Sequence, residues 1–358
     1  MRTITLHLIP GDGIGVEVMA AATRALTTLA DLHGGLRFHW QEQPWSCAWS
    51  LEHGTMMPGD GLARLADGDA ILLGAVGFPG VPDHVSLRGL LLPIRMGFDQ
   101  FVNLRPVTLL PGLQSPLRVA GSEIDFVVFR ENTEGEYCGV GRLELAGTPE
   151  ETAVQEGRFT RRGTERIIRH AFEHARRYGK AKVVSATKSN ALNHSMVFWD
   201  RIFDEVQVDF PEIAGESVHV DALAGRFLLN PGDLEVVVAS NLFGDILTDL
   251  GSAMLGSIGI SPSANLDPTR RHPSMFEPVH GSAPDIAGRG LANPVGMLWT
   301  TVLMLEHVEL PELARGLMAA LCEVLAADKV RTPDLGGTAT TEEVTDAVLA
   351  ALPGCLLT

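Results

Sequence analysis

Apolar and polar positions follow two different repeats along the chain, and these repeats predict alternating strands and helices. Residues 3–9 show the two-residue alternation of a strand, whereas residues 16–31 show the helical repeat. Further strands are predicted from short apolar runs at 69–77, 124–131, 181–188 and 234–241, and 217–225 begins as a strand. Further helices are predicted at 85–98, 160–178, 295–308 and 312–327, and directly after residue 241. This order indicates an α/β fold with a largely parallel sheet.

A glycine-rich turn, GDGIG at residues 11–15, follows the first predicted strand. Its spacing does not match the Rossmann pattern G-x-G-x-x-G, because Val16 occupies the place of the third glycine. No phosphate-loop lysine follows it either. The turn either touches a ligand or only links a strand to a helix, and both interpretations stay open.

The composition limits the class of protein. The 358 residues are enough for two domains or lobes. Lys and Arg total 28 against 44 Asp and Glu, and this net charge of −16 disfavours nucleic acid and anionic membranes as partners. Four scattered cysteines predict reduced thiols rather than disulfides or a zinc site: Cys47, Cys138, Cys322 and Cys355. With no signal-peptide layout and no apolar run near the roughly 20 residues that span a bilayer, we expect a cytoplasmic protein.

Two carboxylates stand four residues apart on the helix predicted after residue 241. This spacing places Asp245 and Asp249 on one face, where a divalent cation would relieve their repulsion. Oxygen ligands suit Mg²⁺ or Mn²⁺, and Asp221, expected on another strand, is a third candidate ligand. The alternative is an ordinary solvated helix face.

Three arginines stand near the ends of predicted elements: Arg95, Arg105 and Arg130. Arginine binds carboxylates through two parallel hydrogen bonds, so three converging arginines would suit a dicarboxylate. The alternative is that each is an ordinary surface residue.

Lysine and tyrosine are rare in this chain, which has four lysines and two tyrosines. Lys188 ends a predicted strand in SATKSN, and Tyr137 follows the segment ENTEGE. Lysine can accept a proton whereas arginine cannot, so Lys188 and Tyr137 are candidate acid–base groups. Lys188 could equally be a surface lysine.

A long loop at 277–294 is rich in Gly, Pro and Ala and contains His280 and Asp285. Backbone N–H groups in such a loop can approach a flat or phosphorylated ligand closely. An acidic side chain there would hold ribose hydroxyls and repel a 2′-phosphate, which favours NAD over NADP. By composition alone, the segment is an irregular loop.

Together these segments resemble the decarboxylating 2-hydroxy-acid dehydrogenases of the isocitrate/isopropylmalate dehydrogenase family. The resemblance runs from IPGDGIG to LGGTATTEEV and is carried by SNLFGDILTDLGSAMLGSIGI, SATKSN, ENTEGEY and HGSAPDIAGRG. Within the family, LEHGTMMPGDGL, VGFPGVPDHVSL, DQFVNLRP and SPSANLDPTRRHPSMFEPVHGSAPD are most similar to tartrate and D-malate dehydrogenases.

The resemblance implies a two-lobed α/β fold with a mixed sheet flanked by helices, and not a Rossmann fold. Residues 1–100 and 256–358 would form a large nucleotide-binding lobe, and 101–255 a lobe for substrate, metal and dimerisation. The protein would be a homodimer in which both subunits contribute to each active site.

The resemblance also implies roles for residues. Arg95, Arg105 and Arg130 would hold substrate carboxylates. Asp245 and Asp249 would bind the metal with Asp221 supplied by the partner subunit, which would also supply Lys188 as the base, and Tyr137 would be the acid. The NAD site would be lined by His280, Gly281, Ser282, Ala283, Asp285, Ile286, Asn293 and Asn190.

The implied reaction is NAD- and metal-dependent oxidative decarboxylation of a small (2R)-2-hydroxy dicarboxylate, of the D-malate or tartrate type. Lys188 would remove the hydroxyl proton as hydride passes to NAD⁺, and Tyr137 would protonate carbon after loss of CO₂. A monovalent cation such as K⁺ is a further candidate cofactor. Alternatives are a substituted malate (3-isopropylmalate, homoisocitrate or a phosphonomethyl malate), a metal-dependent non-redox decarboxylase or lyase, and a non-catalytic binding protein.

The chain departs from the tartrate/D-malate pattern at Arg88, where SLRG replaces the usual SLWG. Arg88 lies seven residues before Arg95, near the position that sets the choice of substrate side chain in relatives. We hypothesise that Arg88 favours a substrate with an additional anionic group; the alternative is that it points to solvent. Phe101, Ala191 and Val197 are smaller departures.

Overall fold

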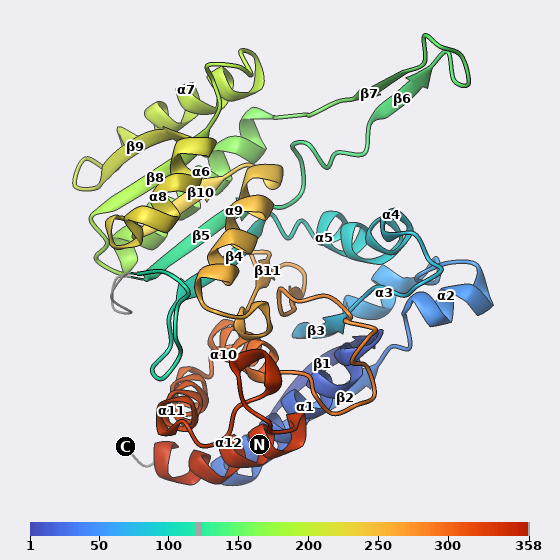
Figure 1. The fold of residues 1–358 in the computed structure, drawn as a ribbon, viewed down its shortest axis with the longest axis vertical. Coiled ribbons are helices and arrows are strands. Elements are labelled where there is room, and N and C mark those ends of the chain that lie inside the picture. The colour runs from blue at the N-terminus through green and yellow to red at the C-terminus, as the bar shows by residue number, and fades with distance from the viewer. Residues whose placement is uncertain (119–123, 357–358) are drawn as a thin grey trace. The chain divides into compact units, whose positions relative to one another are not determined.

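The computed structural model describes residues 1–118 and 124–356, which belong to two compact units (Figure 1). Unit 1 comprises Met1–Gln100, Thr108–Gly121 and Ser252–Thr358, and unit 2 comprises Phe101–Val107 and Ser122–Gly251. The expectation that one lobe serves the nucleotide and the other the substrate stays a prediction. None of the helices in the described ranges is long and apolar enough to cross a membrane.

The strands of unit 1 lie in the order β2-β1-β3-β12-β11. Their bounds are Arg2–Gly11 (β1), Leu36–Glu42 (β2), Ala70–Ala75 (β3), Ala264–Leu266 (β11) and Ser274–Phe276 (β12). β1 pairs in parallel with β2 and β3, as β12 does with β3, whereas β11 is antiparallel to β12. All six residues of β3 are buried, as the uninterrupted apolar run predicts. The predicted mixed α/β sheet is confirmed.

The helices of unit 1 include the mostly apolar α10, whose buried residues extend around the helix and lie against α1 and α11. The α-helices are α1 (Ile14–His33), α2 (Cys47–His53), α3 (Gly61–Leu65), α4 (Asp83–Ser86), α5 (Leu92–Gly97), α10 (Val295–His307), α11 (Pro311–Ala327) and α12 (Thr341–Leu356). Short 3₁₀ turns lie at Ile258–Ile260 and Pro333–Leu335.

The helix predicted at 85–98 is confirmed as a helical segment, but it is not a single α-helix. The structure has α4, then a π-helical turn at Leu87–Leu91, then α5. Pro93 lies in the first turn of α5, and because proline has no backbone N–H it cannot donate to the preceding turn. The chain therefore changes its helical hydrogen-bond pattern here.

The strands of unit 2 lie in the order β4-β5-β10-β8-β9, and β10 pairs in parallel with β5 and β8, as β8 does with β9. Their bounds are Val102–Thr108 (β4), Asp125–Glu131 (β5), Lys182–Thr187 (β8), Ala214–His219 (β9) and Val236–Ala239 (β10). The helices are α6 (Arg161–Arg177), α7 (Ser195–Gln207), α8 (Val220–Leu229) and α9 (Asn241–Met254), with a 3₁₀ turn at Pro231–Asp233. A separate antiparallel hairpin joins β6 (Gly141–Glu144) to β7 (Thr152–Gln155), and it is visible in green in Figure 1.

Asp221 lies on a helix and not on a strand, so the predicted placement is wrong. β9 ends at His219, and Asp221 stands in the first turn of α8. A carboxylate is favourable there because the amino end of a helix carries partial positive charge.

Candidate active site

The helix that carries the predicted acidic pair, α9, begins directly after the buried strand β10. β10 ends at Ala239 and α9 begins at Asn241, so the helix starts at the carboxyl end of the parallel sheet of unit 2. In open α/β sheets this edge is where ligands usually bind. Asp245 and Asp249 lie on this helix, as the sequence predicts.

Arg130, near the end of β5, is held by the first two turns of α9. Its Nε and Nη2 donate to Asn241 Oδ1 at 3.1 and 2.7 Å, and its Nη1 donates to Asp245 Oδ1. A side chain at Gly244 would place Cβ 2.6 Å from Arg130 Cβ and Cγ, so this glycine makes room for the arginine. With 2% of its surface exposed, Arg130 is a buried and well-partnered cation.

Arg105, on β4, approaches the next turn of the same helix. Its Nη1 donates to Thr248 Oγ1 at 2.5 Å. Its Nη2 lies 3.8 Å from Asp245 Oδ1, and its Nη1 lies 3.8 Å from Asp249 Oδ1. The structure thus brings two of the three predicted arginines together with both predicted metal ligands on α9.

Tyr137 joins this group through its hydroxyl, which donates to Asp245 Oδ2 at 2.8 Å. The Arg130 guanidinium carbon lies 5.5 Å from the centre of the Tyr137 ring. Burial, followed by the negative charge of Asp245, raises the pKa of Tyr137 to about 12. The phenol therefore keeps its proton at neutral pH, as a general acid requires.

Lys188 and Asp221 form a second group. Lys188 Nζ lies 2.8 Å from Asp221 Oδ2, and this hydrogen bond is the main cause that lowers the pKa of Asp221. Asn190, a cofactor candidate, is exposed two residues after Lys188. Within one chain, therefore, Lys188 and Asp221 contact each other, while Tyr137 contacts Asp245.

The acidic pair has the chemistry of a site for a hard divalent cation. Burial raises the pKa of Asp249, and the charge of Asp245 adds to this effect while Arg105 opposes it. A cation between the two carboxylates would relieve this repulsion, and carboxylate oxygens suit Mg²⁺ or Mn²⁺. Among residues 1–118 and 124–356, no three His, Cys, Asp or Glu side chains of one chain form a metal site.

Arg95, the third predicted arginine, lies in unit 1 on α5. Its Nη2 donates to Glu277 Oε1 at 2.6 Å, and Asn265 Nδ2 donates to the same oxygen at 2.8 Å. Arg95 and Glu277 are buried, with 6% and 8% of their surfaces exposed. Arg95 Nε is buried and has no hydrogen-bond partner among the described residues, so it offers a donor for a ligand. Arg88 lies on the π-helical turn Leu87–Leu91, a geometry frequent at functional sites.

His280 presents a buried acceptor in the predicted nucleotide loop. Its Nδ1 lies 3.0 Å from the carbonyl oxygen of Gly281, and because a carbonyl can only accept, Nδ1 carries the proton. Burial lowers the pKa of His280, so the ring is neutral and Nε2 is an acceptor. Nε2 is buried without a hydrogen-bond partner in the part of the chain that the structure describes. This orphaned atom fits a ligand N–H group such as the amino group of adenine.

The GDGIG turn supports this loop. Ile14 N–H donates to the Ser282 carbonyl oxygen at 2.9 Å. Gly13 has φ +58°, and a Cβ there would lie 2.0 Å from the same oxygen. One turn further, Glu17 Oε1 accepts from Gly288 N–H at 2.6 Å. The turn therefore positions the loop, a role that the sequence left open.

The remaining cofactor candidates lie along the same loop. Ala283 has φ +39°, and its carbonyl oxygen accepts from Ile286 N–H at 3.1 Å. Asp285 is exposed beside them. Asn293 is buried, and its Oδ1 accepts from Val295 N–H at 3.0 Å. The loop is thus a series of tight turns that end at the start of α10.

Comparison with known proteins places this geometry in a family. A profile described as isocitrate/isopropylmalate dehydrogenase matches residues 5–348. The chain belongs to the isocitrate/isopropylmalate dehydrogenase family. The predicted resemblance is confirmed, and the protein is an oxidoreductase.

Individual relatives agree with this assignment. The "Probable tartrate dehydrogenase/decarboxylase" of Bacillus subtilis (strain 168) is 51% identical and covers 98% of this chain and 99% of its own length. The "D-malate dehydrogenase [decarboxylating]" of Escherichia coli (strain K12) is 48% identical, with coverage of 97% and 98%. The crystal structure of isocitrate dehydrogenase from Methylococcus capsulatus superposes with a TM-score of 0.88 at 31% identity, covering 98% and 99% of the two chains.

Four residues of this dehydrogenase contact predicted site residues but were not themselves predicted from the sequence: Asn241, Thr248, Glu277 and Asp334. The last accepts from Asn293 Nδ2 at 2.9 Å. Glu277 stands three residues before His280, Asn241 stands four residues before Asp245, and Thr248 stands three residues after Asp245. These positions on the same loop and the same helix were the available signals, whereas nothing near Asp334 in the sequence indicated its partner.

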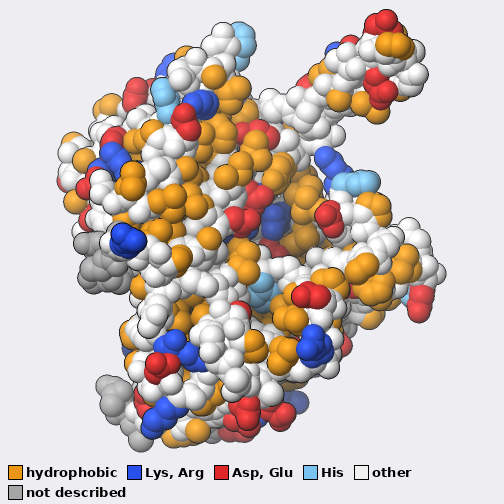
Figure 2. Space-filling model, viewed as in Figure 1, with side chains coloured by type: hydrophobic (Ala, Val, Ile, Leu, Met, Phe, Trp, Pro, Cys, Tyr) orange, Lys and Arg blue, Asp and Glu red, His pale blue; other side chains and the backbone are white. Residues whose placement is uncertain are grey.

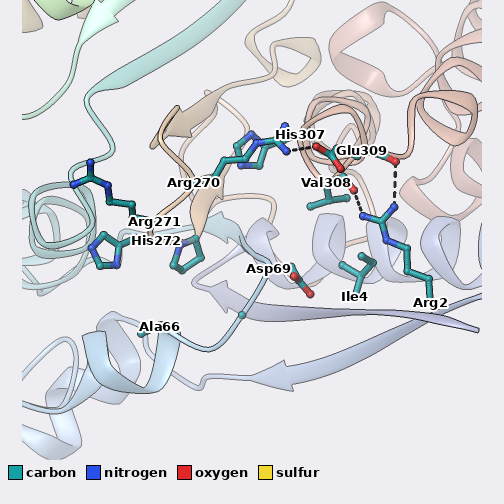
Figure 3. A pocket seen from close by; sticks show the side chains of 12 residues that line it. Arg2, Ile4, Ala66, Asp69, Arg270, Arg271, His272, His307, Val308 and Glu309 are labelled. Atoms are coloured by element: carbon teal, nitrogen blue, oxygen red, sulfur yellow. Dashed lines mark hydrogen bonds and ion pairs between the residues drawn. The ribbon is translucent and has the colours of Figure 1, made fainter.

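A separate cavity of about 230 Å³ lies in unit 1 of the dehydrogenase (Figure 3). Its lining includes Arg2, Asp69, Arg270 and Glu309. Figure 3 shows Arg2 and Arg270 directed toward the end of α10, where Arg2 Nη2 donates to Val308 O at 2.6 Å and Arg270 pairs with Glu309. These cations already have partners, and the cavity lining contains none of the predicted site residues.

Proposed function

We propose that this dehydrogenase catalyses NAD-dependent oxidative decarboxylation of a small (2R)-2-hydroxy dicarboxylate, of the D-malate or tartrate type. The observation that carries the proposal is the group of Arg105, Arg130 and a protonated Tyr137 around Asp245 on α9. The names of the relatives, tartrate dehydrogenase/decarboxylase and decarboxylating D-malate dehydrogenase, support the same reaction.

Different residues bind the substrate carboxylates and the metal ion. Arg105 and Arg130, with Arg95, hold the carboxylates through charge-assisted hydrogen bonds. Asp245 and Asp249 hold Mg²⁺ or Mn²⁺. When bound, that cation supplies Lewis acidity at the oxygen on C2.

Two residues move protons. Lys188 would accept the proton of the 2-hydroxyl, and NAD⁺, when bound, would supply the acceptor for the hydride that leaves C2. Oxidation at C2 makes the substrate a β-keto acid, so the bond between C3 and its carboxylate can then break with release of CO₂, and its electron pair passes to the C2 carbonyl as an enolate. Tyr137 gives the proton from its hydroxyl oxygen to the carbon that lost CO₂, a role that its pKa of about 12 supports at neutral pH.

NAD would bind along residues 280–293. The acceptor at His280 Nε2 suits the amino group of adenine, and Asp285 suits ribose hydroxyls while repelling a 2′-phosphate. Asn190 in unit 2 stays a predicted contact of the cofactor. A K⁺ requirement also stays a prediction.

The enzyme would work as a homodimer. Apolar side chains are exposed on the helices that carry the aspartates: Leu228 at 39%, Leu229 at 76% and Ile246 at 57%. Figure 2 shows hydrophobic atoms gathered over this face of unit 2. An exposed apolar patch of this kind marks an interaction surface. A partner subunit seated there could bring its Asp221 and Lys188 to the Asp245 group, which supplies the missing metal ligand.

Arg88 favours a second candidate substrate for the same reaction. In place of the tryptophan usual in tartrate and D-malate dehydrogenases, it adds a cation to the π-helical turn before Arg95. A substituted malate with a further anionic group is therefore the second candidate substrate.

The test is the ratio of NADH to CO₂ formed from D-malate with NAD⁺ and Mn²⁺. The proposal predicts one NADH for each CO₂. Release of CO₂ without NADH would instead indicate a non-redox decarboxylase, and formation of neither product from any 2-hydroxy dicarboxylate would indicate a binding protein.

A further inference from the structure

The hydroxyl of Thr248 connects Arg105 to the backbone of α9. Thr248 and Arg105 are both buried, with 1% and 8% of their surfaces exposed. Arg105 Nη1 donates to Thr248 Oγ1 at 2.5 Å, and Oγ1 donates in turn to the carbonyl oxygen of Gly244 at 2.8 Å. A chain of two hydrogen bonds thus runs from the guanidinium into the helix.

The direction of these bonds follows from donor chemistry. The hydroxyl has one hydrogen, which it directs to the backbone carbonyls one turn earlier, at 2.8 Å from Gly244 O and 3.2 Å from Asp245 O, so its lone pairs face the arginine. The helix fixes the position of that carbonyl and therefore fixes the acceptor for Arg105. Consecutive hydrogen bonds of this kind strengthen each other.

A neutral acceptor has a specific advantage at this position. The carboxylate oxygens of Asp245 and Asp249 lie 3.8 Å from Arg105 nitrogens, beyond hydrogen-bond distance, whereas the hydroxyl is at 2.5 Å. A hydroxyl orients a cation without cancelling its charge. Arg105 also forms ion pairs with Asp245 and Asp249, so the hydroxyl contributes a fixed orientation of the guanidinium rather than another negative charge.

We propose that Thr248 is a positioning residue for substrate binding, which holds the Arg105 guanidinium on α9 in the orientation that receives a substrate carboxylate. This inference rests on the proposed function through the role of Arg105. It adds a residue that touches neither substrate nor cofactor.

The test compares Thr248→Val, which removes the hydroxyl at similar volume, with Thr248→Ser, which keeps it. The Kd of D-malate is measured by isothermal titration calorimetry with Mg²⁺ present and NAD⁺ absent, so that no turnover is needed. We expect Thr248→Val to weaken binding about tenfold and Thr248→Ser to stay within about threefold of the wild type.

Thr345 provides a matched control in α12. It is buried to the same extent, at 1% exposed, and its hydroxyl likewise donates to the carbonyl one turn earlier, at 2.7 Å from Thr341 O. Thr345→Val should leave the Kd of D-malate unchanged. The Kd of NAD⁺ should be unchanged in all three variants, because Thr248 acts on an arginine and not on the nucleotide loop.

Equal D-malate affinity in the valine and serine variants would overturn the inference, as would an equal loss of NAD⁺ affinity in Thr248→Val. Thr248→Ala serves as a second variant if the valine variant does not fold, with the same tenfold expectation. A wild type that binds D-malate but forms no NADH would overturn the proposed reaction while the Kd comparison still decides the role of Thr248. A wild type that does not bind D-malate would overturn both.

Discussion

The hydroxyl of Tyr137 donates a hydrogen bond to Asp245 in a half-buried environment, and this environment determines its chemistry. Replacing Tyr137 with Phe removes the proton donor and leaves the ring in place. We expect kcat for D-malate to fall about 10²-fold, a typical contribution of a general acid. Tyr178→Phe is the matched control, because Tyr178 is the other tyrosine and is 59% exposed; it should retain full activity. Equal activity of both variants would show that Tyr137 is not the general acid.

The raised pKa of Tyr137 predicts how the stability of the folded protein depends on pH. Its pKa is raised from 10 to about 12 in the folded protein, so between these values the folded chain holds a proton that the unfolded chain has lost. The contribution of this phenol to stability is therefore present below pH 10 and is lost as pH rises toward 12. The free energy of unfolding, measured with urea between pH 10 and pH 12, should therefore fall less in Tyr137→Phe than in Tyr178→Phe.

Arg88 allows a direct test of substrate choice. Arg88→Trp restores the residue usual in tartrate and D-malate dehydrogenases. We expect kcat/KM to shift away from acids with an additional anionic group and toward D-malate, because a cation near the substrate is lost. An unchanged ranking of substrates would mean that Arg88 points to solvent.

At the scale of elements, the turn before α1 and the nucleotide loop depend on each other. Gly13→Ala would place Cβ 2.0 Å from Ser282 O, so the loop must move. We expect NAD⁺ affinity to fall at least about tenfold. Gly34→Ala is the control: Gly34 also has positive φ, at +70°, but no atom lies within 4 Å of the added Cβ. It should cost about 1 kcal/mol of stability and leave NAD⁺ affinity unchanged.

Calorimetric titration of NAD⁺ into both alanine variants distinguishes the two effects. A similar loss of affinity in both would show that backbone strain, and not the contact with Ser282, is responsible.

The elements show what the sequence could and could not predict. Long apolar runs such as β3 and the amphipathic α6 were predictable because burial imposes their patterns. The π-helical turn before Pro93 and the change from strand to helix before Asp221 were missed, because both depend on a local change of backbone geometry within an apolar stretch. The hairpin β6–β7 was missed because nearly all of its residues are exposed and leave no apolar alternation.

The candidate site was predictable where one element orders its residues. Asp245 and Asp249 follow from helical spacing, and α9 places them as expected. The partners Asn241 and Thr248 were missed because their importance appears only when β4 and β5 bring Arg105 and Arg130 to this helix. Contacts between segments far apart in the sequence need the fold.

At the scale of the whole molecule, a dimer would complete the active site. Leu229→Asp introduces a charge at a 76% exposed apolar position on α8. We expect it to shift the protein from dimer to monomer in light scattering after size exclusion, and to lower activity strongly. Val208→Asp is matched in exposure, also 76%, but lies after α7, and it should change neither property. A monomeric wild type with full activity would contradict shared active sites.

The most direct test of the central claim is NADH formation with Mn²⁺ over a panel of 2-hydroxy acids. The panel includes D-malate, the tartrates, 3-isopropylmalate, isocitrate, homoisocitrate and a phosphonomethyl malate, each with NAD⁺ and with NADP⁺. We expect NADH to form from at least one of these dicarboxylates, with NAD⁺ preferred over NADP⁺. Preference for D-malate or a tartrate would support the proposed substrate, and preference for a more highly charged acid would assign specificity to Arg88. If neither nucleotide were reduced with any of these acids, the proposed oxidative decarboxylation would be contradicted.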